Sequence, residues 1–274
     1  MTRPDGPGSY VAIDLETTGL DPATDRVIEL GAIRFDRSGR IFASFDRLVN
    51  PLRPSHPRAL AVHGIDDAIL AAEPTTDVVL PEFLAFLGDR EGSVLLAHGA
   101  SFDAAFLGAE LARLGGAIPD WPIVDTLALG RRIRPELPSH RLGELARIYG
   151  LDPAGSHRAL ADATRVMGLW LALGGPDLAE QPPPVAYPIH DPALPLPPPS
   201  GWEPLSEAVA TARRVRLVYE GGTRGDFPRE ITPRRFLYRG GRAYVSATCH
   251  ADSREKEFCL ERVRSYELLG PDAG

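Results

Sequence analysis

Two acidic residues near the N-terminus carry the clearest signal for chemistry in this chain. Asp14 and Glu16 lie in residues 10–20, which read Y-V-A-I-D-L-E-T-T-G-L. The β-branched and aliphatic residues run into a Thr-Thr-Gly turn, so residues 10–16 are predicted to form a strand. Side chains two apart on a strand project from the same face. The two carboxylates would repel each other there unless a cation lies between them, and such oxygen ligands suit Mg²⁺ or Mn²⁺.

Two further clusters of polar residues follow in the sequence. Taken singly, each acidic residue also has an ordinary explanation, as a solvated side chain or as a charge that stabilises a helix N-terminus. Asp103 falls in the first turn of a helix that Ser101 is predicted to cap, directly after an apolar strand expected over residues 93–97. His157 and Asp162 are five residues apart, about 140° around a helix, so they cannot share a face if both are helical. We therefore expect His157 in a flexible loop and Asp162 on the helix that follows.

The elements that must position these groups alternate along the first two thirds of the chain. Period-two and buried apolar runs predict strands over residues 10–16, 26–35, 41–49, 93–97 and 121–124. Helical periodicity and capping residues predict helices within residues 59–73, from 75 or 76, from 101, and over 125–132, 142–149 and 158–173. Strands first, followed by alternating strands and helices, predict an α/β fold with a mixed sheet flanked by helices.

A change in composition divides the chain. Residues 174–204 contain eleven prolines and no periodic apolar pattern, which predicts an extended, semi-stiff linker. A proline-rich ligand for a partner domain is the alternative. The linker separates a domain at residues 9–173 from a second one at 205–269, with tails at 1–8 and 270–274. The second domain is predicted as a short helix over residues 205–213 followed by a small β-barrel of short strands, at 215–219, 227–232, 235–239, 242–249 and 255–260.

Composition narrows the class of protein. The net charge is −7, and it is divided unevenly, with −9 in residues 1–200 and +2 in residues 201–274. No apolar run is long enough to span a membrane, and residues 1–8 lack the apolar core of a signal peptide. The two cysteines are too few for a disulfide framework. We expect a cytoplasmic protein with reduced thiols and no membrane partner.

Together the three clusters resemble the DnaQ-like 3′–5′ exonucleases of the DEDDh type over residues 9–173. The Thr17-Thr18-Gly19 turn and the Val62-His63-Gly64-Ile65 loop add to the resemblance. It implies an RNase H-like fold and two-metal hydrolysis of a phosphodiester at a nucleic-acid 3′ end, with release of nucleoside 5′-monophosphates.

The resemblance also implies roles for individual residues. Asp14, Glu16, Asp103 and Asp162 would bind two Mg²⁺ or Mn²⁺ ions, and His157 would take the proton from the attacking water. The residues implied to hold the terminal nucleotide are Thr17, Thr18, Gly19, His63, His98 and Phe102. The chain departs from the family where His98-Gly99 replaces the common His-Asn. A side-chain amide is thereby missing near the third carboxylate, and we expect a changed grip on the substrate.

The C-terminal part resembles the WYL domain, an SH3-like barrel of bacterial regulators that binds nucleic acid or nucleotide-like ligands. Matching positions over residues 205–269 are Tyr219, Arg229, Pro233, Gly241, Tyr244, Phe258 and Arg262. The Trp-Tyr-Leu triplet that gives the domain its name is replaced here by Ala243-Tyr244-Val245. Lys256 stands where arginine is usual. Candidate ligand contacts are Tyr219, Arg229, Arg234, Tyr244 and Arg262. Arginines interleaved with aromatic residues can follow a phosphate backbone and stack bases, or form a solvated face over core aromatics.

The sequence thus predicts a metal-dependent 3′–5′ exonuclease with a C-terminal module for nucleic acid or a nucleotide-like ligand. Single-stranded DNA is the favoured substrate, and a polymerase or repair protein is the expected partner in a bacterial, nucleoid-associated setting. RNA 3′-end trimming is the alternative within the enzyme class. An inactive nuclease fold that binds nucleic acid or a ligand is the alternative outside it.

Overall fold

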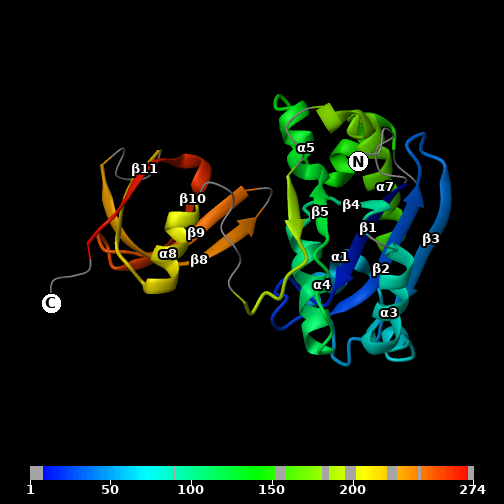
Figure 1. Cartoon of the computed structure of the whole chain (residues 1–274). Coiled ribbons are helices and arrows are strands. Elements are labelled where there is room, and N and C mark those ends of the chain that lie inside the picture. Colours follow the sequence, from blue (N-terminus) through cyan, green and yellow to red (C-terminus); the bar gives the residue numbers. More distant parts are fainter. Residues whose placement is uncertain are drawn as a thin grey trace. The chain divides into compact units, whose positions relative to one another are not determined.

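The structure of the chain is a computed structural model (Figure 1). It describes residues 9–88, 90–151, 158–180, 185–194, 202–220, 227–239 and 242–270. Two compact units are present, Met1–Ala193 and Leu194–Gly274. His157 lies outside the described residues, as do residues 1–8 of the predicted N-terminal tail and 271–274 of the C-terminal one.

A six-stranded sheet forms the centre of the first unit, in the order β3-β2-β1-β4-β5-β6. The strands are β1 (Ser9–Thr17), β2 (Val27–Phe35), β3 (Ile41–Leu48), β4 (Ser93–Ala97), β5 (Pro122–Asp125) and β6 (Ala186–Pro188). β1 pairs antiparallel with β2 and parallel with β4, so the sheet is mixed, as predicted. β1 lies inside the sheet and is apolar on both faces over its first half, which explains its nearly continuous burial.

Seven α-helices accompany this sheet among the described residues of the first unit. They are α1 (Pro57–His63), α2 (Asp67–Leu70), α3 (Thr76–Leu87), α4 (Ser101–Arg113), α5 (Thr126–Ile133), α6 (Leu142–Tyr149) and α7 (Ala159–Ala172). α7 packs against β1 and β2. Its Val166, Leu169 and Trp170 are buried in one cluster with Tyr10 and Phe35 of these strands. This packing fixes α7 on the sheet face that carries Asp14 and Glu16.

Part of the segment predicted as a linker is folded into the first unit. Residues Gly175–Glu180 form a 3₁₀ helix, η1, and β6 pairs antiparallel with β5. Tyr187 in the middle of β6 is buried, opposite Ile123. Prolines are compatible with this position because β6 is an edge strand, where one side makes no ladder hydrogen bonds.

The second unit is an antiparallel sheet with one helix, α8 (Glu203–Thr211). Its strands are β7 (Val215–Tyr219), β8 (Arg229–Arg239), β9 (Arg242–Cys249), β10 (Arg254–Cys259) and β11 (Val263–Leu268), with a 3₁₀ turn η2 (Leu260–Arg262) before β11. The order is β10-β9-β8-β7-β11, and within the described residues no ladder joins β10 to β11. The small antiparallel sheet agrees with the prediction, whereas a closed barrel is not established. None of the described helices is long and apolar enough to cross a membrane.

Candidate active site

One face of strands β1 and β2 is divided into an apolar half and an acidic half. Pairing places Tyr10 opposite Phe35 in the apolar half, and Asp14 opposite Gly31 and Glu16 opposite Glu29 in the acidic half. The alternation of side chains along a strand puts all of these positions on one face. The apolar half buries the second part of α7, so the first turn of α7 lies over the acidic half.

The start of α7 lies close to the sheet because Gly31 has no side chain. A Cβ atom at Gly31 would come within 2.2 Å of the Ala159 carbonyl carbon, a distance that real Cβ atoms do not reach. Asp162 lies in the first turn of this helix, on the same stripe as Val166 and Leu169. Carboxylate oxygens of Asp14, Glu16 and Asp162 all lie within 4.8 Å of one another. Two strand residues and one helix residue, about 150 residues apart in the chain, thus form one acidic cluster.

The electrostatics of this cluster favour a cation. Burial raises the pKa of Asp14 well above its ordinary value, and the neighbouring charges of Asp103, Asp162 and Glu16 raise it further. Burial and the charge of Asp162 raise the pKa of Glu16 from 4.5 to about 7. Carboxylates hold their negative charge at this spacing when a divalent cation lies between them. The donor set, made of carboxylate oxygens alone, fits Mg²⁺ or Mn²⁺.

Asp103 lies beside this cluster rather than within its 4.8 Å group. It is buried in the first turn of α4, and its charge is the largest electrostatic contribution to the raised pKa of Asp14 after burial. The loop before α4 is held by Asp125, whose Oδ1 accepts hydrogen bonds from the N–H groups of Gly99 (2.8 Å) and Leu127 (2.9 Å). Asp125 is fully buried and thereby fixes the segment that carries Asp103.

Glu29 is a further carboxylate on this face, and it holds protein groups rather than an open ligand position. It is fully buried. Its Oε2 accepts a hydrogen bond from the N–H of Ala159 at 3.0 Å, and its Oε1 lies 2.7 Å from a guanidinium nitrogen of Arg158. A negative charge at a helix N-terminus is stabilising, and here it also ties the start of α7 to β2. Glu29 therefore positions Asp162.

Replacing Glu29 by glutamine should lower catalytic efficiency by about 10- to 100-fold, the usual cost of losing a group that orients a metal ligand. The amide cannot accept from Ala159 and neutralise Arg158 at the same time. Steady-state kinetics give kcat/KM, and titration with Mn²⁺ gives the affinity for the metal ion. Glu82→Gln is the matched control, because Glu82 forms an exposed ion pair with Arg47 (2.7 Å). Equal effects of the two substitutions would contradict the role of Glu29.

A cavity of about 430 Å³ lies beside the acidic cluster. Its lining includes Glu16, Thr17, Gly19, Leu20, His63 and Phe102. Cavities of this size hold small ligands such as nucleotides. Thr17, Gly19, His63 and Phe102, which the resemblance implies as nucleotide contacts, are thus brought together at one cavity next to Glu16.

His63 presents an unused hydrogen-bond donor in this cavity wall. Its Nδ1 accepts a hydrogen bond from the N–H of Ile65 at 3.1 Å, so the neutral ring carries its proton on Nε2. Burial lowers the pKa of His63, which keeps the ring neutral. Nε2 is buried and has no hydrogen-bond partner among the described residues. Buried donors are normally hydrogen-bonded, so this N–H is a candidate contact for a ligand.

Thr18 and His98 are placed differently from the other implied nucleotide contacts. The Thr18 hydroxyl is buried and hydrogen-bonded to Asp25 and Arg26. His98 Nε2 donates to the carbonyl of His140 at 2.8 Å, and His98 Nδ1 lies 3.1 Å from the Thr126 hydroxyl. Burial lowers the pKa of His98 to about 4. Both side chains use their polar atoms inside the protein, which favours a structural role for them.

Gly99, the departure from the family pattern, has a φ of +83°, a conformation that suits glycine. Its N–H is one of the donors to Asp125. Backbone hydrogen bonding thus holds the loop that follows β4.

The C-terminal candidates separate into a buried group and an exposed one. Arg229 and Arg262 lie over the ring of Tyr219, at 5.7 and 5.1 Å from its centroid. Tyr219 and Arg229 are buried, and the Tyr219 hydroxyl accepts from the N–H of Cys259. Tyr244 packs partly buried against the same core, whereas Arg234 is exposed. Cation–π packing of this kind stabilises the unit, and Arg234 and Arg262 are the exposed charges of the set.

Sequence reasoning missed the supporting carboxylates Glu29, Asp125 and Asp25. Each accepts hydrogen bonds from backbone N–H groups of a segment that carries a site residue. The available signal was weak: Glu29 is an acid within an otherwise apolar strand, and Asp125 follows one directly. Such acids are seldom buried without partners, which is the only sequence-level pointer to them.

Comparison with known proteins agrees with both resemblances seen in the sequence. Residues 11–169 match the family model described as exonuclease (RNase_T), and residues 202–268 match the WYL domain. The PolC-type DNA polymerase III of Halalkalibacterium halodurans is 38% identical over 154 residues, which make up 56% of this chain and 10% of that protein. The DNA polymerase III subunit epsilon of Treponema pallidum is 38% identical over 167 residues, 60% of this chain and 76% of that protein. The chain thus spans about a tenth of the PolC-type relative.

Among solved structures, the nuclease domain of 3′hExo, a DEDDh family member bound to rAMP, gives a TM-score of 0.55 at 16% identity. The match covers 66% of this chain and 97% of that one, and it shows that the first unit has the RNase H-like fold of these nucleases. The exonuclease model alone spans more than half of the residues. The chain belongs to the exonuclease family, with a WYL domain in its C-terminal part.

Proposed function

We propose that this protein is a metal-dependent 3′–5′ exonuclease that releases nucleoside 5′-monophosphates from the 3′ ends of nucleic acids. The observation that carries the proposal is the acidic cluster of Asp14, Glu16 and Asp162, within 4.8 Å, beside a cavity of nucleotide size. Partly buried carboxylates beside a cavity, two of them (Asp14 and Glu16) with raised pKa values, mark a functional site.

The residues divide between holding metal and holding substrate. Asp14, Glu16 and Asp162 would bind two divalent ions together with Asp103, and such ions stabilise the charge that develops in phosphodiester hydrolysis. His63 would donate through Nε2–H to the terminal nucleotide, and Phe102 would contact it within the cavity. His157, by the family resemblance, would accept the proton of the attacking water. Its pKa near neutrality suits that task.

DNA is the substrate that we favour, in single-stranded form. The relatives with 38% identity are DNA polymerase III proteins, so a polymerase or a repair protein is the partner that we favour. A cytoplasmic, nucleoid-associated location goes with this substrate and stays a prediction.

Degradation of 5′-labelled DNA and RNA oligomers with Mg²⁺ or Mn²⁺ tests the proposal. A ladder that shortens by one nucleotide from the 3′ end is expected, and the faster of the two substrates identifies the sugar preference. RNA trimming would appear as the reverse preference. If neither oligomer is cut with either ion while both are bound, the protein is an inactive nuclease fold that serves as a binding module.

For the C-terminal unit we propose that it binds a nucleic-acid strand. Its limits at residues 205–269 and its SH3-like barrel stay predictions. The support is basic charge on an open sheet: Arg234 and Arg235 are both exposed on β8. Arginines in such positions contact phosphates without sequence preference.

Replacing Arg234 and Arg235 together by alanine should weaken binding of long single strands while sparing cleavage of dinucleotides. If both contact phosphates, the slope of log K against log salt should fall by about 1.4. Fluorescence anisotropy over a salt series measures it. Arg90→Ala serves as the control, because Arg90 is an exposed arginine of the other unit that pairs with Asp120. An unchanged slope would contradict a phosphate-binding role for this strand.

A further inference from the structure

The loop after β1 forms one wall of the cavity and is held by both backbone and side-chain hydrogen bonds. Residues 17–20 supply Thr17, Gly19 and Leu20 to the cavity lining. Thr18 donates its backbone N–H to the carbonyl of Arg26 at 2.8 Å, and its own carbonyl accepts from the N–H of His56 at 2.7 Å. These two bonds anchor the loop at one point only. The Thr17 hydroxyl also donates to the carbonyl of Gly19 at 2.6 Å, and the Thr18 hydroxyl contacts the carboxylate of Asp25, which itself lines the cavity.

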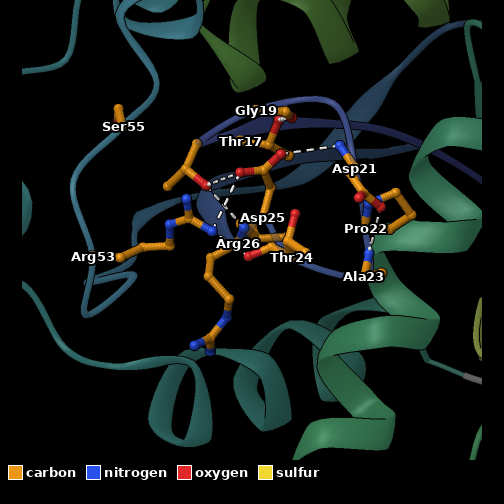
Figure 2. Close-up of polar contacts among 12 residues, drawn as sticks. Thr17, Gly19, Asp21, Pro22, Ala23, Thr24, Asp25, Arg26, Arg53 and Ser55 are labelled. Atoms are coloured by element: carbon orange, nitrogen blue, oxygen red, sulfur yellow. Dashed lines mark hydrogen bonds and ion pairs between the residues drawn. The ribbon is translucent and has the colours of Figure 1, made fainter.

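Asp25 connects the segments around this loop (Figure 2). Its Oδ2 accepts a hydrogen bond from the N–H of Asp21 at 3.0 Å, and its Oδ1 accepts from the Thr18 hydroxyl at 3.2 Å. A guanidinium nitrogen of Arg53 lies 3.4 Å from Oδ1. Asp25 is 9% exposed, so these are largely buried, charge-assisted interactions. They join the loop after β1, the start of β2 and the segment before α1.

The fit around Asp25 is close. The Thr18 hydroxyl, 0% exposed, accepts from the N–H of Arg26 at 3.0 Å while it donates to Asp25, so its position is fixed from both sides. A Cβ atom at Gly19 would lie 2.3 Å from Oδ2 of Asp25. The glycine therefore lets the loop backbone approach the carboxylate, and a loop held this closely has little freedom to shift.

We propose that Asp25 is a positioning residue for the terminal nucleotide: acting with Thr18 and Arg53, it holds residues 17–20 in the conformation that forms the cavity wall. The inference rests on the proposed function. It goes beyond it by giving a carboxylate outside the acidic cluster a part in substrate binding. Loss of Asp25 loosens the wall but leaves Asp14, Glu16 and Asp162 on β1 and α7. Substrate binding therefore suffers more than the chemical step, which raises KM with little change in kcat.

Asp25→Asn is the first test, because asparagine keeps the size of the side chain and removes the charge that faces Arg53. We expect KM for a short 3′-terminal oligonucleotide to rise about tenfold, the effect of losing a hydrogen bond to a charged group, with kcat within about twofold. Mn²⁺ affinity, measured by calorimetry, should stay within about twofold of the wild-type value because the acidic cluster is intact.

Asp36→Asn is the matched control. Asp36 accepts N–H groups of Ser38 and Arg40 in the turn at the other end of β2, away from the cavity lining. It should leave KM unchanged. Arg53→Ala removes one partner that is 39% exposed and should raise KM about threefold, and it decides the question if Asp25→Asn does not fold.

Several results would overturn the positioning role. One is a fall in thermal stability without a rise in KM. Another is a fall in kcat with unchanged KM, or a KM effect equal to that of Asp36→Asn. Absence of nuclease activity in the wild-type protein would instead refute the proposed function itself, so the two failures are distinguishable.

Discussion

Replacing Asp14 by asparagine should abolish hydrolysis and, in the absence of divalent ions, make the protein more stable. Asp14 shares one cluster with Glu16 and Asp162, the residues that would hold the metal ions. Such ions stabilise the charge of the transition state by several kcal/mol, so losing one of their ligands should lower kcat by roughly a thousandfold or more. The same substitution removes a carboxylate whose pKa is raised by burial and by its acidic neighbours. Relief of that repulsion should raise the melting temperature of the metal-free protein by about 2–4 °C for each kcal/mol.

Single-turnover cleavage and thermal unfolding, each with and without Mn²⁺, measure the two effects together. Added Mn²⁺ should stabilise the wild type and leave Asp14→Asn nearly unaffected, because a ligand that binds only the folded state stabilises it. Asp120→Asn is the control, an exposed acid whose charge lies in a surface ion pair with Arg90. An Asp14→Asn variant that is less stable than the wild type without metal would show that the acids do not repel one another in the folded protein.

The second large effect concerns pH. The pKa of Glu16 rises from 4.5 to about 7 in the folded state, so between these values the folded protein binds more protons than the unfolded chain. The free energy of unfolding of the metal-free protein should therefore be greatest below pH 4.5 as far as Glu16 is concerned, and should fall as the pH rises to about 7. The contribution is on the order of 3 kcal/mol.

Divalent ions should reverse this trend, because they bind the deprotonated carboxylates. The apparent Mn²⁺ affinity should increase as the pH rises to about 7 and then level off. Denaturant unfolding and Mn²⁺ titrations at pH 5, 6, 7 and 8 provide the data, and Glu16→Gln should flatten both profiles. A metal-free stability that increases steadily over this range would refute the raised pKa of Glu16.

Local pattern was sufficient to predict which kind of element carries each acidic residue of the first unit. The alternation along β1 placed Asp14 and Glu16 on one face, and the five-residue spacing from His157 placed Asp162 on the helix that became α7. The meeting of these two elements could be expected only through the family resemblance. Its cause lies in Gly31 and in Glu29, whose contacts with Ala159 cross more than 120 residues of chain and leave no local signature.

Other features escaped prediction for identifiable reasons. β6 lies among prolines, which hide a short edge strand whose only strong feature is the buried Tyr187. Strands expected separately at 227–232 and 235–239 are the single strand β8, because Pro233 is accommodated at an irregularity of register with β9 rather than ending the strand. Residues 263–268 form β11, a strand that the charged residues of that segment conceal.

The division of one sheet face into an apolar half and an acidic half has an evolutionary consequence. The apolar half packs against the second part of α7, while Asp14 and Glu16 in the acidic half repel each other when both are charged and no ion is bound. A homologue in which neutral residues replaced these acids would lose catalysis, and its metal-free form would have a larger free energy of unfolding. Homologues that bind nucleic acid without cleaving it can therefore arise by few substitutions. A shared fold does not by itself show that a relative is a nuclease.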